Sequence, residues 1–214
     1  MLSYVLELLD GSHDRAGFVS GLDSVDRYLR ETARSHMEKG VSVTRVLIKA
    51  EAMKPKAVLG YFTLSNITVE AREWPEAPKG LPRQAVSAVL LGRLAVAQAC
   101  HGNGIGSMLV ASARQLARET IMRTGGVGLV VDAAHEEIVG YYARYGFLRV
   151  VPAGLRMFLP RVSLEAGAEI QLDRMASMGQ AVRPGDTRKG KMTQNDPKIT
   201  IGGEGGIRTL VRLP

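Results

Sequence analysis

Hydrophobic and polar positions in the first third of the chain predict one helix and three strands. Apolar side chains in residues 22–40 recur every three or four positions, which predicts an amphipathic helix with a basic outer face. Residues 2–9 are expected to form a first strand. Residues 41–50 and 57–66 are rich in β-branched and aromatic side chains, with a Lys-Pro turn between them, so they predict an antiparallel pair of strands.

The central part of the chain alternates between strands and helices. Residues 85–97 are almost continuously apolar, as expected for a central strand that is buried on both faces, and residues 126–133 predict a second, shorter buried strand. Between them, apolar positions from residue 105 onward mark one face of a helix running to about Thr120. Residues 135–146 predict another helix, which Gly146 ends.

Toward the C-terminus the periodic pattern weakens. Residues 71–84 carry three prolines and predict a loop, while the segments FLRVV and LRMFLP, 147–151 and 155–160, predict two closing strands. Beyond about Arg161 the pattern fades, and residues 179–214 are polar, glycine-rich and expected to be disordered. We therefore expect one domain of mixed α/β class over residues 1–162, followed by a largely disordered extension over residues 163–214.

Composition narrows the range of functions. No apolar run approaches the roughly 20 residues that span a bilayer, and the N-terminus does not resemble a secretory signal, so we expect a cytoplasmic protein. The single cysteine, Cys100, excludes an internal disulfide, and four histidines without ligand spacing predict no metal. A net charge of +7 is compatible with a polyanionic partner and equally with a basic surface that has none.

The chemistry is concentrated in the stretch QACHGNGIGSML, where Gly102, Gly104 and Gly106 come directly before a predicted helix. Glycine raises the entropic cost of ordering a loop, so a compensating gain is expected there. Free backbone N–H groups at the start of a helix, together with the helix dipole, bind phosphate groups. The spacing does not match a dinucleotide-binding fingerprint, and no lysine follows the glycines as in a P-loop.

The residues His101, Gly102, Asn103, Gly104, Ile105 and Gly106 resemble the acetyl-CoA loop of the GNAT acetyltransferases, R/Q-x-x-G-x-G/A. The family has arginine or glutamine where this chain has His101, so the fixed positive charge of arginine is missing and cofactor affinity is expected to depend on pH. The resemblance implies the GNAT fold, a central mixed sheet flanked by helices, with acetyl-CoA as cosubstrate.

The resemblance extends over residues 1 to about 160. The stretches SGLDSVDRYLRETA, GYFTLS, LPRQAVSAVLLGRLAV and EEIVGYYARYGF are similar to the GNAT branch that serves as toxins in toxin–antitoxin pairs. This similarity implies transfer of acetyl to the α-amino group of an aminoacyl-tRNA, which blocks translation. It also implies inhibition by a ribbon-helix-helix antitoxin and a homodimer. An ordinary acetyltransferase of small amines or protein N-termini, and an inactive acetyl-CoA-binding or nucleic-acid-binding regulator, stay open as alternatives.

The resemblance also assigns residues to the reaction. In this fold the strand around Leu94, Ala95 and Val96 diverges from its neighbour, and its free backbone groups hold the pantetheine and polarise the thioester carbonyl. Tyr142 matches the general acid that protonates the departing thiolate, and a tyrosine keeps its proton at pH 7. Tyr141 is the alternative, because adjacent helical tyrosines include at least one that packs in the core.

Basic side chains near the predicted site suggest how an acceptor would bind. Arg93 and Arg83 lie on or before the central strand and are predicted to contact the substrate. The helix residues Arg27, Arg30 and Arg34 are compatible with tRNA phosphates and, equally, with a solvated basic face. Cys100, next to the loop, is interpreted as a small packed residue rather than a nucleophile.

Overall fold

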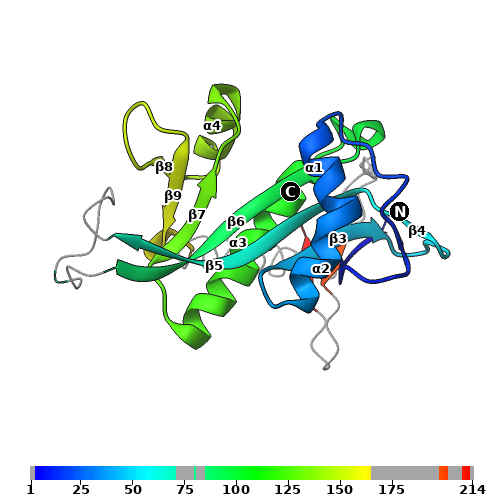
Figure 1. Cartoon of the computed structure of the whole chain (residues 1–214), viewed down its shortest axis with the longest axis horizontal. Coiled ribbons are helices and arrows are strands. Elements are labelled where there is room, and N and C mark those ends of the chain that lie inside the picture. The colour runs from blue at the N-terminus through cyan, green and yellow to red at the C-terminus, as the bar shows by residue number, and fades with distance from the viewer. Residues whose placement is uncertain (1–2, 71–79, 81–84, 165–197, 202–208, 213–214) are drawn as a thin grey trace, which may run out of the picture.

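The computed structural model describes residues 3–70, 80, 85–164, 198–201 and 209–212, and they form an α/β structure around one large sheet (Figure 1). The nine strands lie in the order β11-β10-β1-β3-β5-β6-β7-β9-β8. They are β1 (Ser3–Leu8), β3 (Val43–Lys49), β5 (Gly60–Glu70), β6 (Ala85–Val96), β7 (Gly128–Asp132), β8 (Leu148–Arg149), β9 (Arg156–Pro160), β10 (Lys198–Ile201) and β11 (Thr209–Arg212). The β6–β7 and β1–β10 pairs are parallel, whereas the other neighbours are antiparallel.

One helical segment covers one face of the sheet in front of β3 and β5 (Figure 1). It consists of α1 (Asp23–Arg27), a π-helical turn η1 (Tyr28–Thr32) and α2 (Ala33–Glu38), so the predicted helix is present with a π turn in its middle. Leu29 and Ala33 are fully buried from this segment and pack in one cluster with Tyr61 of β5. This cluster forms the smaller of the two main cores.

The opposite face of the sheet is covered by α3 (Ile105–Thr124), which lies behind β5 and β6 in Figure 1. Its buried side chains, Ile105, Met108, Leu109 and Ile121 among them, pack against the sheet in the larger core. The helix ends at Thr124 rather than near Thr120, where Gly125 caps it with a φ of 79°. A second helix, α4 (Glu136–Ala143), follows β7 and adds Val139 and Tyr142 to the same core.

Strands β6 and β7 diverge, and this divergence creates the space for a site. Only Val89, Leu90 and Leu91 of β6 pair with β7, although β6 continues to Val96 beside β5. The expectation that residues 85–97 are buried on both faces is therefore wrong at the ends of the strand. The buried positions are Ala88, Val89, Leu91 and Ala95, whereas Ala85, Ser87 and Arg93 are exposed.

The strand at residues 2–9 and the antiparallel pair are confirmed as β1 and as β3 with β5, and a short β4 (Lys56–Ala57) forms between the latter two. The closing strands are present as β8 and β9. Most of the predicted loop at 71–84 and of the extension at 163–214 lies outside the described residues, but β10 and β11 belong to the extension, and β10 pairs with β1.

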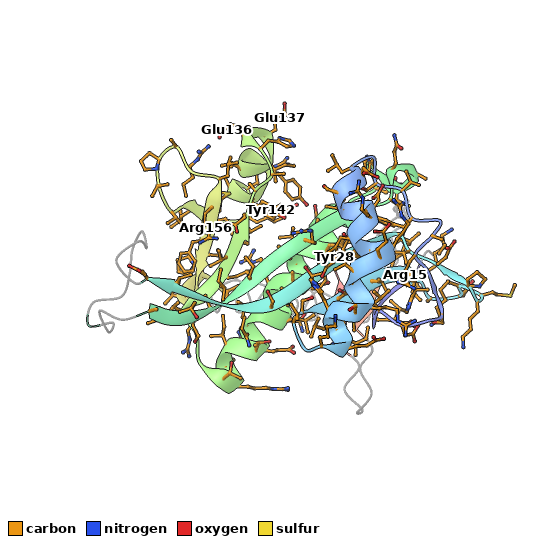
Figure 2. All side chains as sticks on the ribbon, in the orientation of Figure 1. Arg15, Tyr28, Glu136, Glu137, Tyr142 and Arg156 are labelled. Carbon is orange, nitrogen blue, oxygen red and sulfur yellow. The ribbon has the colours of Figure 1, made fainter. Side chains whose placement is uncertain are left out.

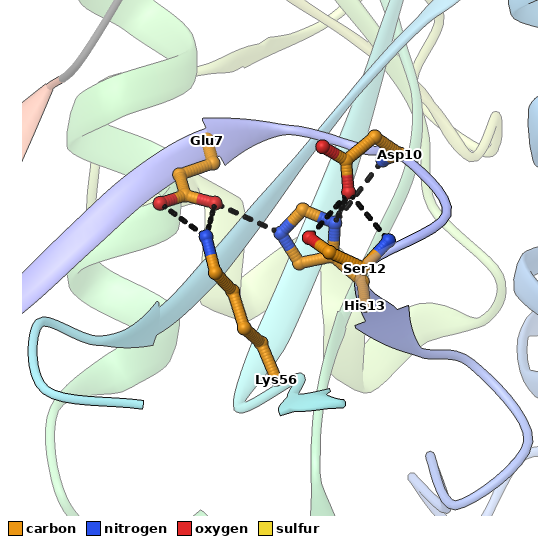
Figure 3. A network of polar contacts seen from close by, with 5 residues as sticks. All are labelled: Glu7, Asp10, Ser12, His13 and Lys56. Atoms are coloured by element: carbon orange, nitrogen blue, oxygen red, sulfur yellow. Dashed lines mark hydrogen bonds and ion pairs between the residues drawn. The ribbon is translucent and has the colours of Figure 1, made fainter. Parts of the chain in front are cut away.

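A polar network fastens the end of β1 to β4 and to the two-residue strand β2 (His13–Asp14) (Figure 3). Lys56 Nζ donates to both carboxylate oxygens of Glu7, at 2.6 and 2.9 Å. The His13 side chain is fully buried, with Nε2 3.1 Å from Glu7 Oε2 and Nδ1 2.8 Å from Asp10 Oδ1. The Ser12 hydroxyl and N–H both donate to Asp10, and the hydroxyl hydrogen bond is the main cause that lowers the pKa of Asp10.

Candidate functional site

The glycine loop joins the end of β6 to the start of α3. After β6 a short 3₁₀ turn, η3 (Gln98–Cys100), leads into the loop, where Gly102 and Gly104 have φ values of 78° and 73°. These left-handed conformations favour glycine, because a Cβ would clash with its own backbone. A Cβ built at either position meets no other atom within 4 Å, so the loop is open on that side.

The start of α3 presents free backbone donors. Met108 N donates to Gly104 O at 3.1 Å and is the first N–H of the helix with an intrahelical acceptor. The N–H groups of Ile105, Gly106 and Ser107 precede it and have no acceptor within the helix. They lie at the positive end of the dipole of a 20-residue helix, which favours an anion such as a pyrophosphate.

The loop forms part of a cleft of about 730 Å³ where β6 leaves β7. Most of the predicted cofactor-binding residues line it together with the predicted general acid: Leu94, Ala95, Val96, His101, Gly102, Gly104, Ile105, Gly106 and Tyr142. Asn103 is not among the lining residues. Cys100 also lines the cleft, half-buried against the larger core, as a packed residue would be. The fold thus brings together segments that are about 40 residues apart in the sequence.

Three tyrosines on or just after α4 have different surroundings. The Tyr145 hydroxyl is 2.7 Å from Ser107 Oγ, so it contacts the first turn of α3. Tyr141 lies over Gly106, where an added Cβ would come within 2.8 Å of the tyrosine hydroxyl. These two side chains hold α4 against the start of α3, and Gly106 is required because Tyr141 fills the space that a side chain would occupy.

Tyr142 lies on the side of α4 that faces β6 (Figure 2), and its ring packs 5.4 Å from that of Phe147. Only 5% of its surface is exposed, and burial raises the pKa of Tyr142 above the ordinary value for tyrosine. Among the described residues its hydroxyl has no hydrogen-bond partner. The hydroxyl is therefore protonated at neutral pH and free to donate toward the cleft.

The structure gives His101 a specific contact. Its Nε2 lies 3.1 Å from the carbonyl oxygen of Val96. Because a carbonyl oxygen only accepts hydrogen bonds, this contact requires a hydrogen on Nε2. In the neutral ring with the proton on Nε2, Nδ1 is an acceptor and cannot donate to a phosphate. The imidazole must therefore be charged to bond Val96 and an anion together.

A wall of the cleft that sequence reasoning missed is formed by Ser20, Gly21 and Leu22. The buried carboxylate of Asp26 accepts hydrogen bonds from the Ser20 hydroxyl at 2.6 Å and from the Ser20 N–H at 3.0 Å. Gln98 N donates to Val19 O at 2.8 Å and joins this wall to η3. In the sequence, this wall falls in the stretch SGLDSVDRYLRETA, which is similar to the GNAT toxins. The similarity did not indicate that Ser20, Gly21 and Leu22 line a cleft.

The predicted substrate-binding arginines are separated by the structure. Arg93 lies outside the cleft, exposed on the α1 side of β6, with its guanidinium 5.1 Å from the centre of the Tyr28 ring. Arg83 lies outside the described residues. The helix arginines are ion-paired on their own segment: Arg27 and Arg30 with Asp23, and Arg34 with Glu38.

Two properties of the described residues bear on metal binding and on membrane insertion. No group of three or more histidine, cysteine, aspartate and glutamate side chains there is placed to hold a metal ion. Within the same part of the chain, no helix combines the length and the apolar character needed to cross a bilayer.

The fold and the loop at the start of α3 define an acetyltransferase of the GNAT class. Residues 28–147 match the Acetyltransferase (GNAT) family, and the chain belongs to this family. The chain is 27% identical over 139 residues to the tRNA-acetylating toxin of Mycobacterium tuberculosis strain H37Rv, covering 65% of this chain and 81% of that protein. It is 26% identical over 172 residues to the probable toxin TacT of Sinorhizobium fredii, covering 76% and 93%.

Solved structures share the fold. AtaT complexed with acetyl-methionyl-tRNAfMet has a TM-score of 0.71 at 26% identity, covering 77% of this chain and 99% of that one. AtaTR bound with acetyl-CoA has a TM-score of 0.68 at 26% identity, covering 77% and 98%. A tyrosine-to-phenylalanine variant of AtaT bound to the C-terminus of the antitoxin AtaR has a TM-score of 0.64 at 25% identity, covering 77% and 96%.

Proposed function

We propose that this protein is a toxin that transfers the acetyl group of acetyl-CoA to the α-amino group of an aminoacyl-tRNA and thereby blocks translation. The observation that carries the proposal is the convergence of Tyr142 of α4 and the glycine loop in the cleft at the end of β6. The relatives support the choice of acceptor, since one is named for tRNA acetylation and one solved structure holds an acetylated methionyl-tRNA.

The residues of the loop fit the diphosphate of acetyl-CoA. The free N–H groups of Ile105, Gly106 and Ser107 would donate to it, and the open side of Gly102 and Gly104 lets the backbone approach an anion closely. Beyond Leu91 the edge of β6 that faces away from β5 has no partner in β7, so the backbone of Leu94, Ala95 and Val96 can hold the pantetheine. Bound there, acetyl-CoA supplies a thioester whose carbonyl carbon is open to attack by an amine.

The chain's own residues act as an oxyanion donor set and a general acid. A free α-amino group has a pKa of about 7.7–8.0, so a useful fraction is neutral at cellular pH and no strong general base is needed. The amine nitrogen forms the new bond to the carbonyl carbon, the carbon–sulfur bond breaks, and the nitrogen loses its proton to solvent. A backbone N–H of β6 stabilises the oxyanion, and the Tyr142 hydroxyl gives its proton to the sulfur.

The same proposal covers partners and organisation. Residues 1–162 form the catalytic domain and residues 163–214 an extension that the reaction does not need. We place the protein in the cytoplasm as a homodimer that a ribbon-helix-helix antitoxin inhibits. The antitoxin is supported by the structure of AtaT with the C-terminus of AtaR.

The test is to incubate the purified protein with radiolabelled acetyl-CoA and total charged tRNA, and then to identify the labelled species. Label that enters charged tRNA, and leaves it when the aminoacyl ester is hydrolysed, supports the proposal. Label confined to free amines or protein N-termini would instead indicate an ordinary acetyltransferase, and binding of acetyl-CoA without any transfer would indicate an inactive regulator. Either result would overturn the proposal.

A further inference from the structure

A β-bulge at Gly92 turns Arg93 toward the α1 face of the sheet. Leu64 of β5 pairs with Leu91 and Thr63 with Arg93, so Gly92 is an extra residue between them. In a regular strand, residues 91, 93 and 95 would share a face. Here Leu91 packs in the core under α3, whereas Ala95 packs in the core under the helical segment α1–η1–α2. Without the bulge, the Arg93 charge would point into the larger core.

The Tyr28 ring provides a fixed surface for the Arg93 guanidinium. The two groups lie 5.1 Å apart, within the range of a cation–π contact. The Tyr28 hydroxyl is 3.1 Å from Ser42 Oγ, and the rings of Tyr28 and His36 form a T-shaped pair with centroids 5.6 Å apart and an interplanar angle of 76°. Tyr28 is therefore held by Ser42 and His36, and the Arg93 guanidinium lies over its ring (Figure 2 labels Tyr28 on the α1 side of β6).

Arg93 differs from the arginines of the helical segment in having no carboxylate partner among the described residues. One guanidinium nitrogen donates to Gly92 O at 2.8 Å, which fixes the group further and leaves the other N–H donors for a ligand. Arg93 comes directly before Leu94, where the cleft lining begins along β6. A fixed, unpaired guanidinium of this kind matches the geometry of a phosphate.

We propose that Tyr28 is a positioning residue that holds Arg93 ready to bind a backbone phosphate near the 3′ end of the acceptor RNA. This inference rests on the proposed function, because the aminoacyl end of the RNA must reach the cleft for transfer to occur. The bulge at Gly92 and the ring of Tyr28 together set the place of the charge, and Arg93 supplies the contact.

The experiment is a double-mutant cycle on affinity for charged tRNA, measured without acetyl-CoA at several salt concentrations. Arg93→Ala is expected to raise the Kd about tenfold, as for loss of a charge-assisted hydrogen bond, and to reduce the salt slope by about 0.7. Tyr28→Leu is expected to raise the Kd about two- to fivefold. In the Arg93→Ala background, Tyr28→Leu should not raise the Kd further, since Tyr28 acts through Arg93. The Kd for acetyl-CoA should stay at the wild-type value in all variants.

Two further variants guard against misfolding of Tyr28→Leu. Tyr28→Phe keeps the ring and should bind charged tRNA more tightly than Tyr28→Leu. Arg93→Lys keeps the charge but loses the planar group that stacks and forms paired hydrogen bonds, so its affinity should fall while its salt slope stays near wild type. Arg27→Ala is the control, because Arg27 is already paired with Asp23 and should affect affinity less than Arg93→Ala does.

The outcomes separate the two proposals. Suppose that the wild-type protein binds and acetylates charged tRNA, but the effects of Tyr28→Leu and Arg93→Ala on the Kd are additive. This result would overturn the positioning role and leave the proposed function standing. Wild-type affinity in Arg93→Lys would overturn it as well. A wild-type protein that neither binds nor labels charged tRNA would instead overturn the proposed function.

Discussion

Replacing Tyr142 with phenylalanine isolates the role of one hydroxyl group. The ring contact with Phe147 is retained, and no hydrogen bond recorded among the described residues is lost, so the free energy of unfolding should change by less than about 0.5 kcal/mol. Removal of a general acid should lower kcat about 10²- to 10⁴-fold. That loss equals about 2.7–5.4 kcal/mol of transition-state stabilisation, far more than the structural effect.

The assay follows transfer of label from acetyl-CoA to charged tRNA in single-turnover reactions, alongside acetyl-CoA affinity by calorimetry. Affinity for acetyl-CoA should be nearly unchanged in Tyr142→Phe. The matched control is Tyr145→Phe, which loses the contact with Ser107 Oγ and should weaken acetyl-CoA binding about two- to tenfold while keeping the rate of transfer. Wild-type turnover in Tyr142→Phe, or an equal loss in Tyr145→Phe, would refute the assignment of Tyr142.

The remaining predictions concern pH, the loop and stability. Because burial raises the pKa of Tyr142, its proton stays in place beyond about pH 10, so the rate should rise as the α-amino group becomes neutral near pH 8 and then level off; a fall between pH 8 and 10 would contradict this. Gly104→Ala places a Cβ at φ 73°, and the backbone strain should cost about 1–2 kcal/mol of free energy. The cost should be measured as a roughly 5- to 30-fold weaker Kd for acetyl-CoA or as an equivalent loss in the free energy of unfolding. A variant with the wild-type Kd and stability would contradict the strain argument. Gly60→Ala would bring a Cβ within 2.8 Å of Leu109 and 2.9 Å of the Ala95 carbonyl, so urea unfolding should show about 1–3 kcal/mol of destabilisation. Asp10→Asn removes a carboxylate whose pKa is lowered mainly by the hydrogen bond from Ser12, so it should lower the free energy of unfolding above about pH 4. The difference in unfolding free energy from wild type should vanish as the pH falls through that lowered pKa. A difference that persists in acid would contradict this linkage.

Local patterns in the sequence carried enough information to predict most of the helices and strands and the position of the glycine loop. Apolar spacing predicted the helical segment at 22–40 and the helix beginning at Ile105, because the period of buried positions reflects which face of a helix is covered. The glycines at 102, 104 and 106 predicted a loop directly before a helix, and the structure places Gly102 and Gly104 in a loop before α3 with positive φ values. Such features depend on neighbours within a few residues, so a single sequence is sufficient to find them.

Tertiary structure decided the rest of the candidate site. The cleft exists because β7 pairs with only three residues of β6, and no local pattern determines where two strands distant in sequence stop pairing. The face that Arg93 occupies depends on the bulge at Gly92 opposite Thr63, and the wall at Ser20 is joined to η3 by the hydrogen bond from Gln98 N to Val19 O. These features come from contacts between segments far apart in the chain, and only the packed sheet and helices bring those segments together.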